Sequence, residues 1–205
     1  MNLVDRAKNI ILRPKEEWQV IDTETTDIPS LYKSYIVPLA AIPVICGLIG
    51  MSLVGVPMPF GGTYHMPFGP ALGAAVARYV LTLVGVYIVA LIVNVLAPSF
   101  SGEKNLVQAL KVTAYAYTPA WLAGIFLLIP WLGILGLLAS LYGLYLLYLG
   151  LPVLMKSPPD RALGYTAIVV ISAIVVFLII GVISAVFLVH PGGMPMQSFG
   201  PGTGQ

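Results

Sequence analysis

Five long apolar stretches, separated by short connections, constrain this sequence more than any other feature. A transmembrane helix needs about 20 apolar residues to cross a hydrocarbon core of ~30 Å. The stretches are continuous, whereas the strands of a membrane barrel alternate between apolar and polar residues. We therefore predict an all-α polytopic membrane bundle of five transmembrane helices. The expected spans are residues 32–55, 71–97, 109–129, 132–155 and 163–189.

Composition agrees with this class of protein. Apolar residues make up 59% of the chain and charged residues only 9%, whereas about a quarter of the residues of a soluble domain are charged. The spans leave no room for a separate soluble domain. We divide the chain into a cytoplasmic amphipathic segment (1–30), a five-span membrane domain (31–190) and an outer tail (191–205) whose Gly, Pro and Met content predicts flexibility.

The charged residues occur in alternate connections. Lys104 and Lys111 fall between the second and third stretches, and Lys156 and Arg161 between the fourth and fifth. The connections 56–70 and 129–132 and the tail contain no Lys, Arg, Asp or Glu. Under the positive-inside rule, this pattern predicts a multi-pass protein of the cytoplasmic (inner) membrane, with the N-terminus in the cytoplasm and the C-terminus outside. The basic residues before the first stretch are Arg6, Lys8, Arg13, Lys15 and Lys33.

Residues 1–13 have the spacing of an amphipathic helix. Its apolar residues are Leu3, Val4, Ala7, Ile10 and Ile11, and its polar residues are Asp5, Arg6, Lys8, Asn9 and Arg13. Such a helix can lie in the membrane interface, or it can cover the end of the bundle. The sequence leaves both places open.

Small residues recur at helical spacing in the third and fourth spans. Stripes of small residues allow membrane helices to approach closely. Close approach matters because lipid tails are as apolar as Leu, so helix association depends on van der Waals contact. The tight turn at Pro130 makes these two spans antiparallel neighbours, so we predict that the stripes form helix-packing faces. Their members are Ala109, Thr113, Ala116, Ala120, Ala123, Gly136, Ser140, Gly143 and Gly150.

Two tyrosine-containing motifs carry a family resemblance. The run Ala114-Tyr115-Ala116-Tyr117-Thr118-Pro119 and, after a hydrophobic hairpin, Leu141-Tyr142-Gly143-Leu144-Tyr145-Leu146 resemble the Yip domain. The opening Arg6-Ala7-Lys8-Asn9-Ile10 and Pro14-Lys15-Glu16-Glu17-Trp18 are similar to the start of its short prokaryotic members. The resemblance implies five helices and a cytosolic N-terminus. Eukaryotic members interact with Ypt/Rab GTPases and carry a longer cytosolic N-terminal region, whereas this chain has only ~30 residues there, which is short for a GTPase-binding domain. A Rab-like partner is therefore doubtful for this chain.

Candidate sites for chemistry are few. The sequence has no His-Glu pair, no nucleophile with a positioned base and no Gly-rich phosphate loop, so we predict that the protein is not an enzyme. Arg78 is the only charged residue that we assign to the interior of a span. We interpret it either as a structural anchor or as part of a transport pathway. Asn94, Tyr115 and Tyr117 complete the candidate pathway.

A metal site is the third possibility. His65, His190, Met194 and Met196 all fall on the expected outer side, and imidazole and thioether ligands select Cu(I). Methionine is also a common apolar filler, which is the competing interpretation. No other cofactor is expected.

We expect the protein to function as an interaction, scaffold or assembly component of the membrane. Its expected partners are the lipid bilayer and other membrane proteins or a second copy of itself, and no nucleic acid. The alternatives are a transporter or channel, and a copper-handling protein of the outer face.

Overall fold

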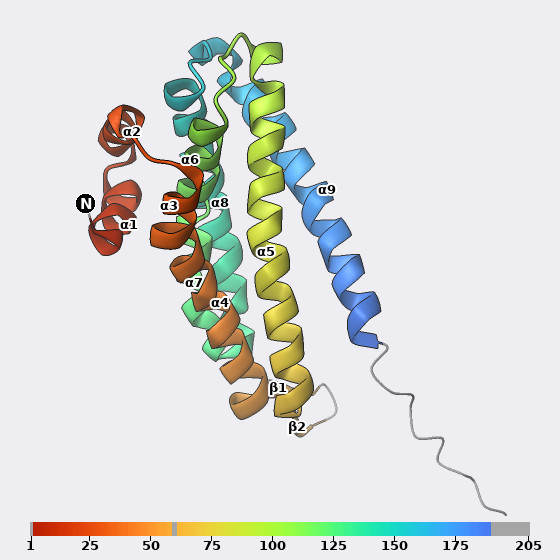
Figure 1. Ribbon diagram of the computed structural model, residues 1–205. Coiled ribbons are helices and arrows are strands. Elements are labelled where there is room, and N and C mark those ends of the chain that lie inside the picture. The colour runs from red at the N-terminus through yellow and green to blue at the C-terminus, as the bar shows by residue number, and fades with distance from the viewer. Residues whose placement is uncertain (1, 59–60, 190–205) are drawn as a thin grey trace, which may run out of the picture.

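The computed structural model describes residues 2–58 and 61–189, and nearly all of these residues are helical. Long helices run alongside one another as a bundle, and two short N-terminal helices lie against its flank (Figure 1). The prediction of an all-α membrane bundle is confirmed, because four helical stretches among the described residues are long and apolar enough to cross a bilayer. They are Ile28–Val54, Phe68–Phe100, Trp131–Leu154 and Pro159–Val182.

Each of these stretches joins several helical elements end to end, which keeps the backbone polar groups paired within the segment as lipid requires. The first contains α3 (Ile28–Leu31), the π-helical turn η1 (Tyr32–Ile36), α4 (Val37–Ile49) and the π-helical turn η2 (Gly50–Val54). The second contains α5 (Phe68–Leu96) and the 3-10 turn η3 (Ala97–Phe100). The third contains most of η5 (Pro130–Gly133) and all of α8 (Ile134–Leu154), and the fourth contains η6 (Pro159–Arg161) and most of α9 (Ala162–Val189).

The predicted span 109–129 is not a continuous helix. It consists of α6 (Leu106–Ala116), α7 (Thr118–Ala123) and the 3-10 segment η4 (Gly124–Leu128), with a turn at Tyr117. Pro119 explains the break, because it has no N–H to donate to the carbonyl of Tyr115 and its ring crowds that carbonyl. Five continuous transmembrane helices are therefore not found; the described residues contain four continuous spans and one broken segment.

The broken segment nevertheless runs along the bundle from one end to the other. Just before α6, the N–H of Glu103 donates to the carbonyl of Met155, 2.8 Å away, in the α8–α9 connection. At the far end of the segment, a Cβ placed on Gly50 would lie 2.0 Å from the carbonyl oxygen of Leu127. Gly50 begins the last turn of the first stretch, so η4 lies beside the opposite end of the bundle.

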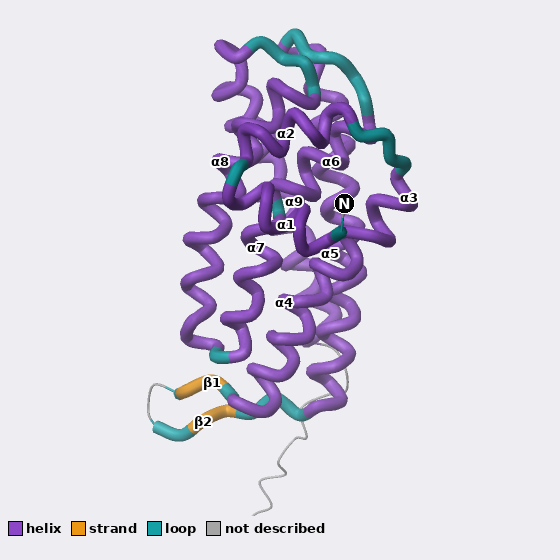
Figure 2. Tube along the Cα trace, turned by 90° about the vertical axis from the view of Figure 1, so that its left-hand side faces the viewer, coloured by secondary structure: helices purple, strands orange, loops and turns teal. Residues whose placement is uncertain are grey.

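A short hairpin marks that opposite end. Strands β1 (Val56–Pro57) and β2 (Thr63–Tyr64) pair antiparallel, with Val56 opposite Tyr64. Figure 2 shows the hairpin at the other end of the molecule from the α5–α6 and α8–α9 connections. Gly55 ends the first helical stretch with φ +79°, a conformation that favours glycine and stops a helix.

The N-terminal residues form two helices, α1 (Leu3–Leu12) and α2 (Pro14–Thr23). Asn2 caps α1, because its side-chain oxygen accepts a hydrogen bond of 2.8 Å from the backbone N–H of Asp5. Pro14 occupies the first turn of α2, where its missing N–H is not needed. Trp18 and Ile21 of α2 are fully buried in the same hydrophobic core as the long helices. The N-terminal segment is thus packed into the bundle.

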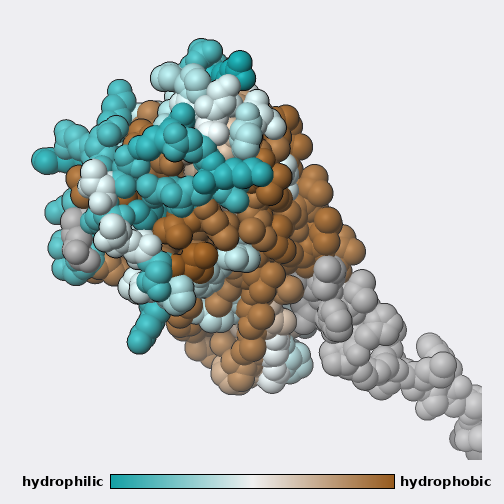
Figure 3. Space-filling view, turned by 45° about the horizontal axis from the view of Figure 1, so that its top comes forward, coloured by the Kyte–Doolittle hydropathy of each residue, from teal (hydrophilic) through white to brown (hydrophobic). Residues whose placement is uncertain are grey.

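Polar and apolar residues occupy different parts of the surface. Large apolar side chains are exposed along the outer faces of α8 and α9, for example Leu138 (63%) and Leu163 (73%). Hydrophilic residues gather over one end of the bundle and the N-terminal helices, above a largely hydrophobic flank (Figure 3). An exposed apolar flank is what a bilayer solvates, so the arrangement fits a membrane-embedded protein.

Candidate functional site

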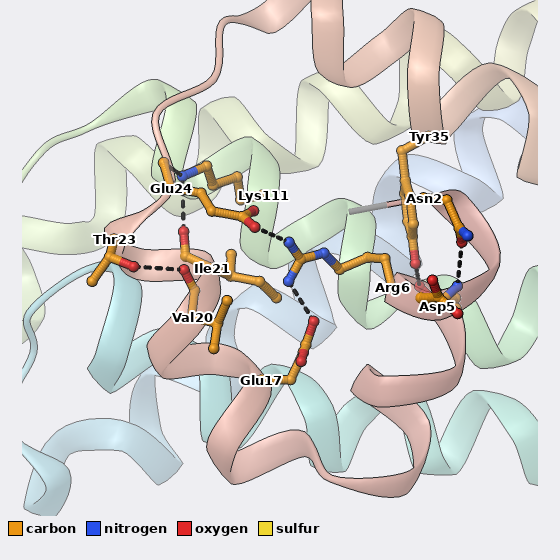
Figure 4. Close-up of polar contacts among 11 residues, drawn as sticks. Asn2, Asp5, Arg6, Glu17, Val20, Ile21, Thr23, Glu24, Tyr35 and Lys111 are labelled. Carbon is orange, nitrogen blue, oxygen red and sulfur yellow. Dashed lines mark hydrogen bonds and ion pairs between the residues drawn. The ribbon is translucent and has the colours of Figure 1, made fainter.

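The most unusual group of side chains is a cluster of charges buried between the N-terminal helices and the bundle. Arg6 of α1 lies between the carboxylates of Glu17 and Glu24, and forms an ion pair with each of them (Figure 4). The side chains of Arg6 and Glu17 are only 6% and 7% exposed, whereas that of Glu24 is 39% exposed. We call Arg6, Glu17, Glu24 and Lys111 the N-terminal charge cluster.

Lys111 brings the second positive charge of this cluster from α6. Its ammonium group donates hydrogen bonds to the backbone carbonyls of Ile21, 2.9 Å away, and of Glu24. A cation beside the last carbonyls of a helix is favourable, because those carbonyls lack partners within the helix and carry the negative end of its dipole. Two positive and two negative groups therefore balance within the cluster, as buried charges require.

One aromatic ring, that of Tyr115, lies against the guanidinium and contacts two further rings. The centre of the Tyr115 ring lies 5.6 Å from the guanidinium carbon of Arg6, a cation–π distance. The ring of Tyr35 lies edge-on to Tyr115 at 4.6 Å, and its hydroxyl is 2.7 Å from that of Thr118. Trp18 contacts Tyr115 at 6.2 Å from the other side. The first span, α2 and α6 therefore meet at Tyr115.

A polar cavity of about 500 Å³ opens beside the cluster. This volume lies in the range of about 300–1,000 Å³ that is usual for small-molecule pockets. The lining combines a guanidinium, a carboxylate, hydroxyls and phenol rings, which are groups that can hold a polar ligand. The lining residues are Asn2, Leu3, Arg6, Thr23, Glu24, Thr25, Thr26, Leu31, Ser34, Tyr35 and Tyr115.

One carboxyl group beside this cavity has a shifted pKa. Asp27 follows Thr26 and precedes α3, and a hydrogen bond with the Ser30 side chain lowers the pKa of the Asp27 carboxyl below its usual value. Asp27 is fully exposed, so it stays charged at the surface of the linker.

Further polar contacts hold the end of α2 to the bundle. Asp22 accepts a hydrogen bond of 3.1 Å from the side-chain amide of Gln108 in α6 and forms an ion pair with Lys156. The hydroxyl of Tyr142 in α8 also donates a hydrogen bond of 2.6 Å to the backbone carbonyl of Ile11 in α1. The N-terminal helices are therefore fixed at several points.

The structure changes two expectations about charge. Arg6 was expected on the polar face of an amphipathic helix, but it is buried, with only 5% of its surface exposed. Lys111 was counted with the connection before the third stretch, although position 111 falls within the predicted span 109–129; it lies inside α6 and is 2% exposed. Arg78 is therefore not the only charged residue within the helices of the bundle, because Lys111 is more deeply buried than Arg78 is.

The predicted packing residues divide into two groups along α8. A Cβ on Gly143 would lie 2.7 Å from the carbonyl oxygen of Ala116, and one on Gly150 would lie 2.8 Å from the Trp18 ring. Gly136, in contrast, has nothing within 4 Å, and Ser140 is exposed. The part of the α8 stripe at Gly143 and Gly150 therefore faces α6 and α2, whereas the part at Gly136 and Ser140 is open.

Their counterparts on α6 and α7 are mostly enclosed. Ala109 and Thr113 are almost completely buried, at 0% and 1% exposure, and Ala116 and Ala123 are each 8% exposed. Ala120 is partly buried. The contribution of these residues to helix packing stays a prediction.

The candidate pathway residues are not brought into one cavity. Arg78 is exposed on α5, and Asn94 lies 16 residues further along the same helix, a rise of about 24 Å. The side-chain oxygen of Asn94 is buried and accepts no hydrogen bond among the described residues. Tyr115 lines the polar cavity and Tyr117 lines a separate apolar one.

Only one of the candidate copper ligands is described. His65 is exposed, in the segment between β2 and α5. His190, Met194 and Met196 lie outside the described residues, as does the tail 191–205. Among the described residues, no three His, Cys, Asp or Glu side chains are grouped closely enough to hold a metal ion. Copper binding stays a prediction from the sequence.

Comparison with known proteins identifies the family. The chain matches the Yip1 domain over residues 8–188. It is 28% identical over 157 residues, 75% of this chain and 80% of the relative, to Inner membrane protein YohC of Escherichia coli strain K12. The same protein of strain O6:H1 gives equal values. No solved structure matches the chain. The match extends over most of the bundle and includes most of the N-terminal helices, so the chain belongs to the Yip1 domain family.

Proposed function

We propose that this protein acts by binding other membrane proteins, as a scaffold or assembly component that associates with itself or joins a larger complex. The observation that supports this proposal most is the fixed position of the N-terminal helices. The bundle binds them through the core contacts of Trp18, the side chain of Asp22 and the backbone carbonyls of Ile11 and Ile21. A surface that is already ordered loses less conformational entropy when it binds a partner.

The outward side of these helices is the surface that we propose for the partner. Lys8, Arg13, Lys15, Glu16 and Gln19 are all exposed on it. Mixed charges give specificity and steer encounter more than they give affinity. We place this surface in the cytoplasm and the C-terminus outside, because basic residues occur in alternate connections. The similarity to an inner membrane protein of Escherichia coli supports the same membrane for this chain.

The proposal assigns no reaction to the protein. The charged groups of the N-terminal charge cluster are bound to one another or to backbone carbonyls. Ion pairs of this kind hold a structure together, whereas a general acid or base must reach a substrate.

Adding negative charge to the exposed surface tests the proposal. Lys15→Glu together with Gln19→Glu should shift the protein to a smaller complex on native gels of membranes solubilised in mild detergent. Lys104→Glu is the matched control, because Lys104 is exposed at the same end of the bundle but lies outside the N-terminal helices. An unmodified protein that migrates as a monomer, or two variants that behave alike, would contradict the proposal.

The transporter alternative is tested separately. Arg78 and Asn94 line neither of the two cavities, so no geometric observation favours a path through them. Solute flux in liposomes that is lost in Arg78→Ala would establish that alternative instead.

A further inference from the structure

A second, apolar cavity of about 540 Å³ lies within the bundle, between α8 and α9, with α6 and α7 behind it. Leu137 and Leu147, which mark its extent along α8, are ten residues apart, a rise of about 15 Å. In Figure 1, α9 runs obliquely and diverges from α5 toward its C-terminal end. We call this cavity the α8–α9 groove.

The groove has an apolar lining. Besides the phenol of Tyr117, its hydroxyls are those of Thr113 and Ser140, and each of these two donates a hydrogen bond of 2.8 Å to the carbonyl four residues earlier in its own helix. Behind them, the ring of Tyr117 contacts the rings of Trp121 and Phe177 at 5.9 Å and 5.8 Å. Such a lining does not hold water, which needs two or more polar partners in a cavity.

The groove opens toward the part of the surface that faces lipid. Leu137 and Leu144 on one lip are 67% and 39% exposed, and Ile174 and Leu178 on the other are 54% and 63% exposed. Empty space beside these residues would forfeit dispersion contacts on one side of the lining. The groove therefore has to be filled by apolar material that arrives from the membrane.

Size distinguishes the two apolar materials that a membrane offers, which are the helix of another protein chain and the acyl chain of a lipid. A volume of 540 Å³ over about 15 Å corresponds to a mean cross-section of about 36 Å². A helix with side chains is about 10–12 Å across, a cross-section of about 80–110 Å², so a helix of a second copy would cover the open side of the groove without filling it. The length of about 15 Å equals half of a hydrocarbon core of ~30 Å, which is the depth of one leaflet.

We propose that the α8–α9 groove is a lipid-binding site that takes one acyl chain of a membrane lipid from a single leaflet. The chain lies along α8, against Ala116, Tyr117 and Ala120, and closes the gap that the oblique α9 leaves open. This site is independent of the proposed partner surface, because it is lined by the membrane helices alone.

Photolabelling in a bilayer tests the proposal. The full chain is reconstituted into phosphatidylcholine vesicles that contain a phosphatidylcholine with a diazirine in one acyl chain, and labelled residues are mapped by mass spectrometry. We expect labels on Ala116, Tyr117 or Ala120, which a lipid reaches only from inside the groove. Lipid-facing Leu141 and Val175, which do not line it, should be labelled as well.

Filling the groove provides the matched variants. Ser140→Phe and Ala173→Phe project a ring into it and should abolish labelling of Ala116, Tyr117 and Ala120. Leu141→Phe and Val175→Phe place the same ring on exposed positions beside it and should retain that labelling. If one of the two groove variants, or one of the two control variants, no longer elutes as a single species in size-exclusion chromatography, the other variant of that pair is used.

Two outcomes would overturn the proposal. Labels confined to exposed residues such as Leu141 in the unmodified protein would show that no acyl chain enters. A disulfide between two copies through Ser140→Cys, formed in membranes of a Cys46→Ala background, would assign the groove to a second protein chain.

Discussion

Arg6 lies on the apolar side of α1, three residues after Leu3 and four before Ile10, and its guanidinium is bound by two carboxylates. A buried ion pair adds little net stability, because desolvation of both partners offsets their attraction. Removing one partner is different, since it leaves an uncompensated buried charge. Arg6 therefore acts mainly to determine where α1 and α2 dock.

Replacing Arg6 tests this interpretation at the scale of one residue. Arg6→Gln should lower the free energy of unfolding by about 3–5 kcal/mol, because the carboxylate of Glu17 stays buried without its partner. Lys8→Gln, on the exposed side of the same helix, should change it by less than ~0.5 kcal/mol. Tryptophan fluorescence during denaturation in mild detergent reports the change, since Trp18 is fully buried. Adding Glu17→Gln to Arg6→Gln should recover part of the loss, and equal stability of both single variants would refute the role of Arg6.

The sequence contains a signal for the burial of Arg6, but it does not identify the partners of Arg6. A charged residue flanked by Leu3 and Ile10 at helical spacing signals a buried charge, and the signal was outweighed by the polar neighbours of Arg6. Glu17, Glu24 and Lys111 could not be identified from the sequence, because their contacts depend on how α1 packs against α2 and on how the end of α2 meets α6. Contacts between residues as far apart as Ile21 and Lys111 are set by tertiary packing.

At the scale of elements, glycines mark where helices approach most closely. Gly124 of η4 and Pro43 of α4 are one such pair, since a Cβ on Gly124 would lie 2.5 Å from the Cβ of Pro43. Gly50 and the carbonyl of Leu127 are another. The short, broken end of the third segment thus packs against the first span through backbone contact.

Gly50→Ala should destabilise the protein, because its new methyl group would overlap the Leu127 carbonyl oxygen, and overpacking costs about 1–3 kcal/mol. Gly73→Ala should stabilise it by up to ~1 kcal/mol, since Gly73 lies in α5 with nothing within 4 Å and alanine favours helix. Melting temperatures in detergent should therefore shift in opposite directions. A shift of the same sign for both variants would contradict the close contact.

Gly143→Leu tests the small-residue stripe of α8. The side chain would meet the Ala116 carbonyl, so we expect a loss of about 1–3 kcal/mol. Gly136→Leu, two turns away on the same stripe, has open space and should be tolerated. Thermal unfolding of the two variants compares them directly, and similar melting temperatures would show that the stripe does not control packing.

The long helices could be predicted from the sequence because continuous apolar runs leave the backbone no alternative in lipid. The expected span 71–97 corresponds to α5 (Phe68–Leu96), and 163–189 to α9 (Ala162–Val189). The break in 109–129 could not be predicted from hydropathy, because a hydropathy profile takes no account of the missing N–H of Pro119. The Thr118-Pro119 pair was its local signal, because the residue before a proline avoids the helical region.

At the scale of the whole molecule, the broken segment decides the topology. Four continuous spans alone would place both termini on the same side of the membrane. A fifth crossing by α6, α7 and η4 would place them on opposite sides, which is what the alternation of basic connections predicts. The contacts of Glu103 and Leu127 lie at opposite ends of the bundle, which supports a complete crossing.

Cysteine labelling in intact cells tests this crossing most directly. In a Cys46→Ala background, which removes the single natural cysteine, one cysteine is placed at Asn2 or at Gln205 and exposed to a membrane-impermeant maleimide. We expect the Gln205→Cys protein to be labelled in intact cells and the Asn2→Cys protein to be labelled only after the membrane is permeabilised. Labelling of both proteins, or of neither, before permeabilisation would place the termini on one side and contradict a complete crossing by the broken segment.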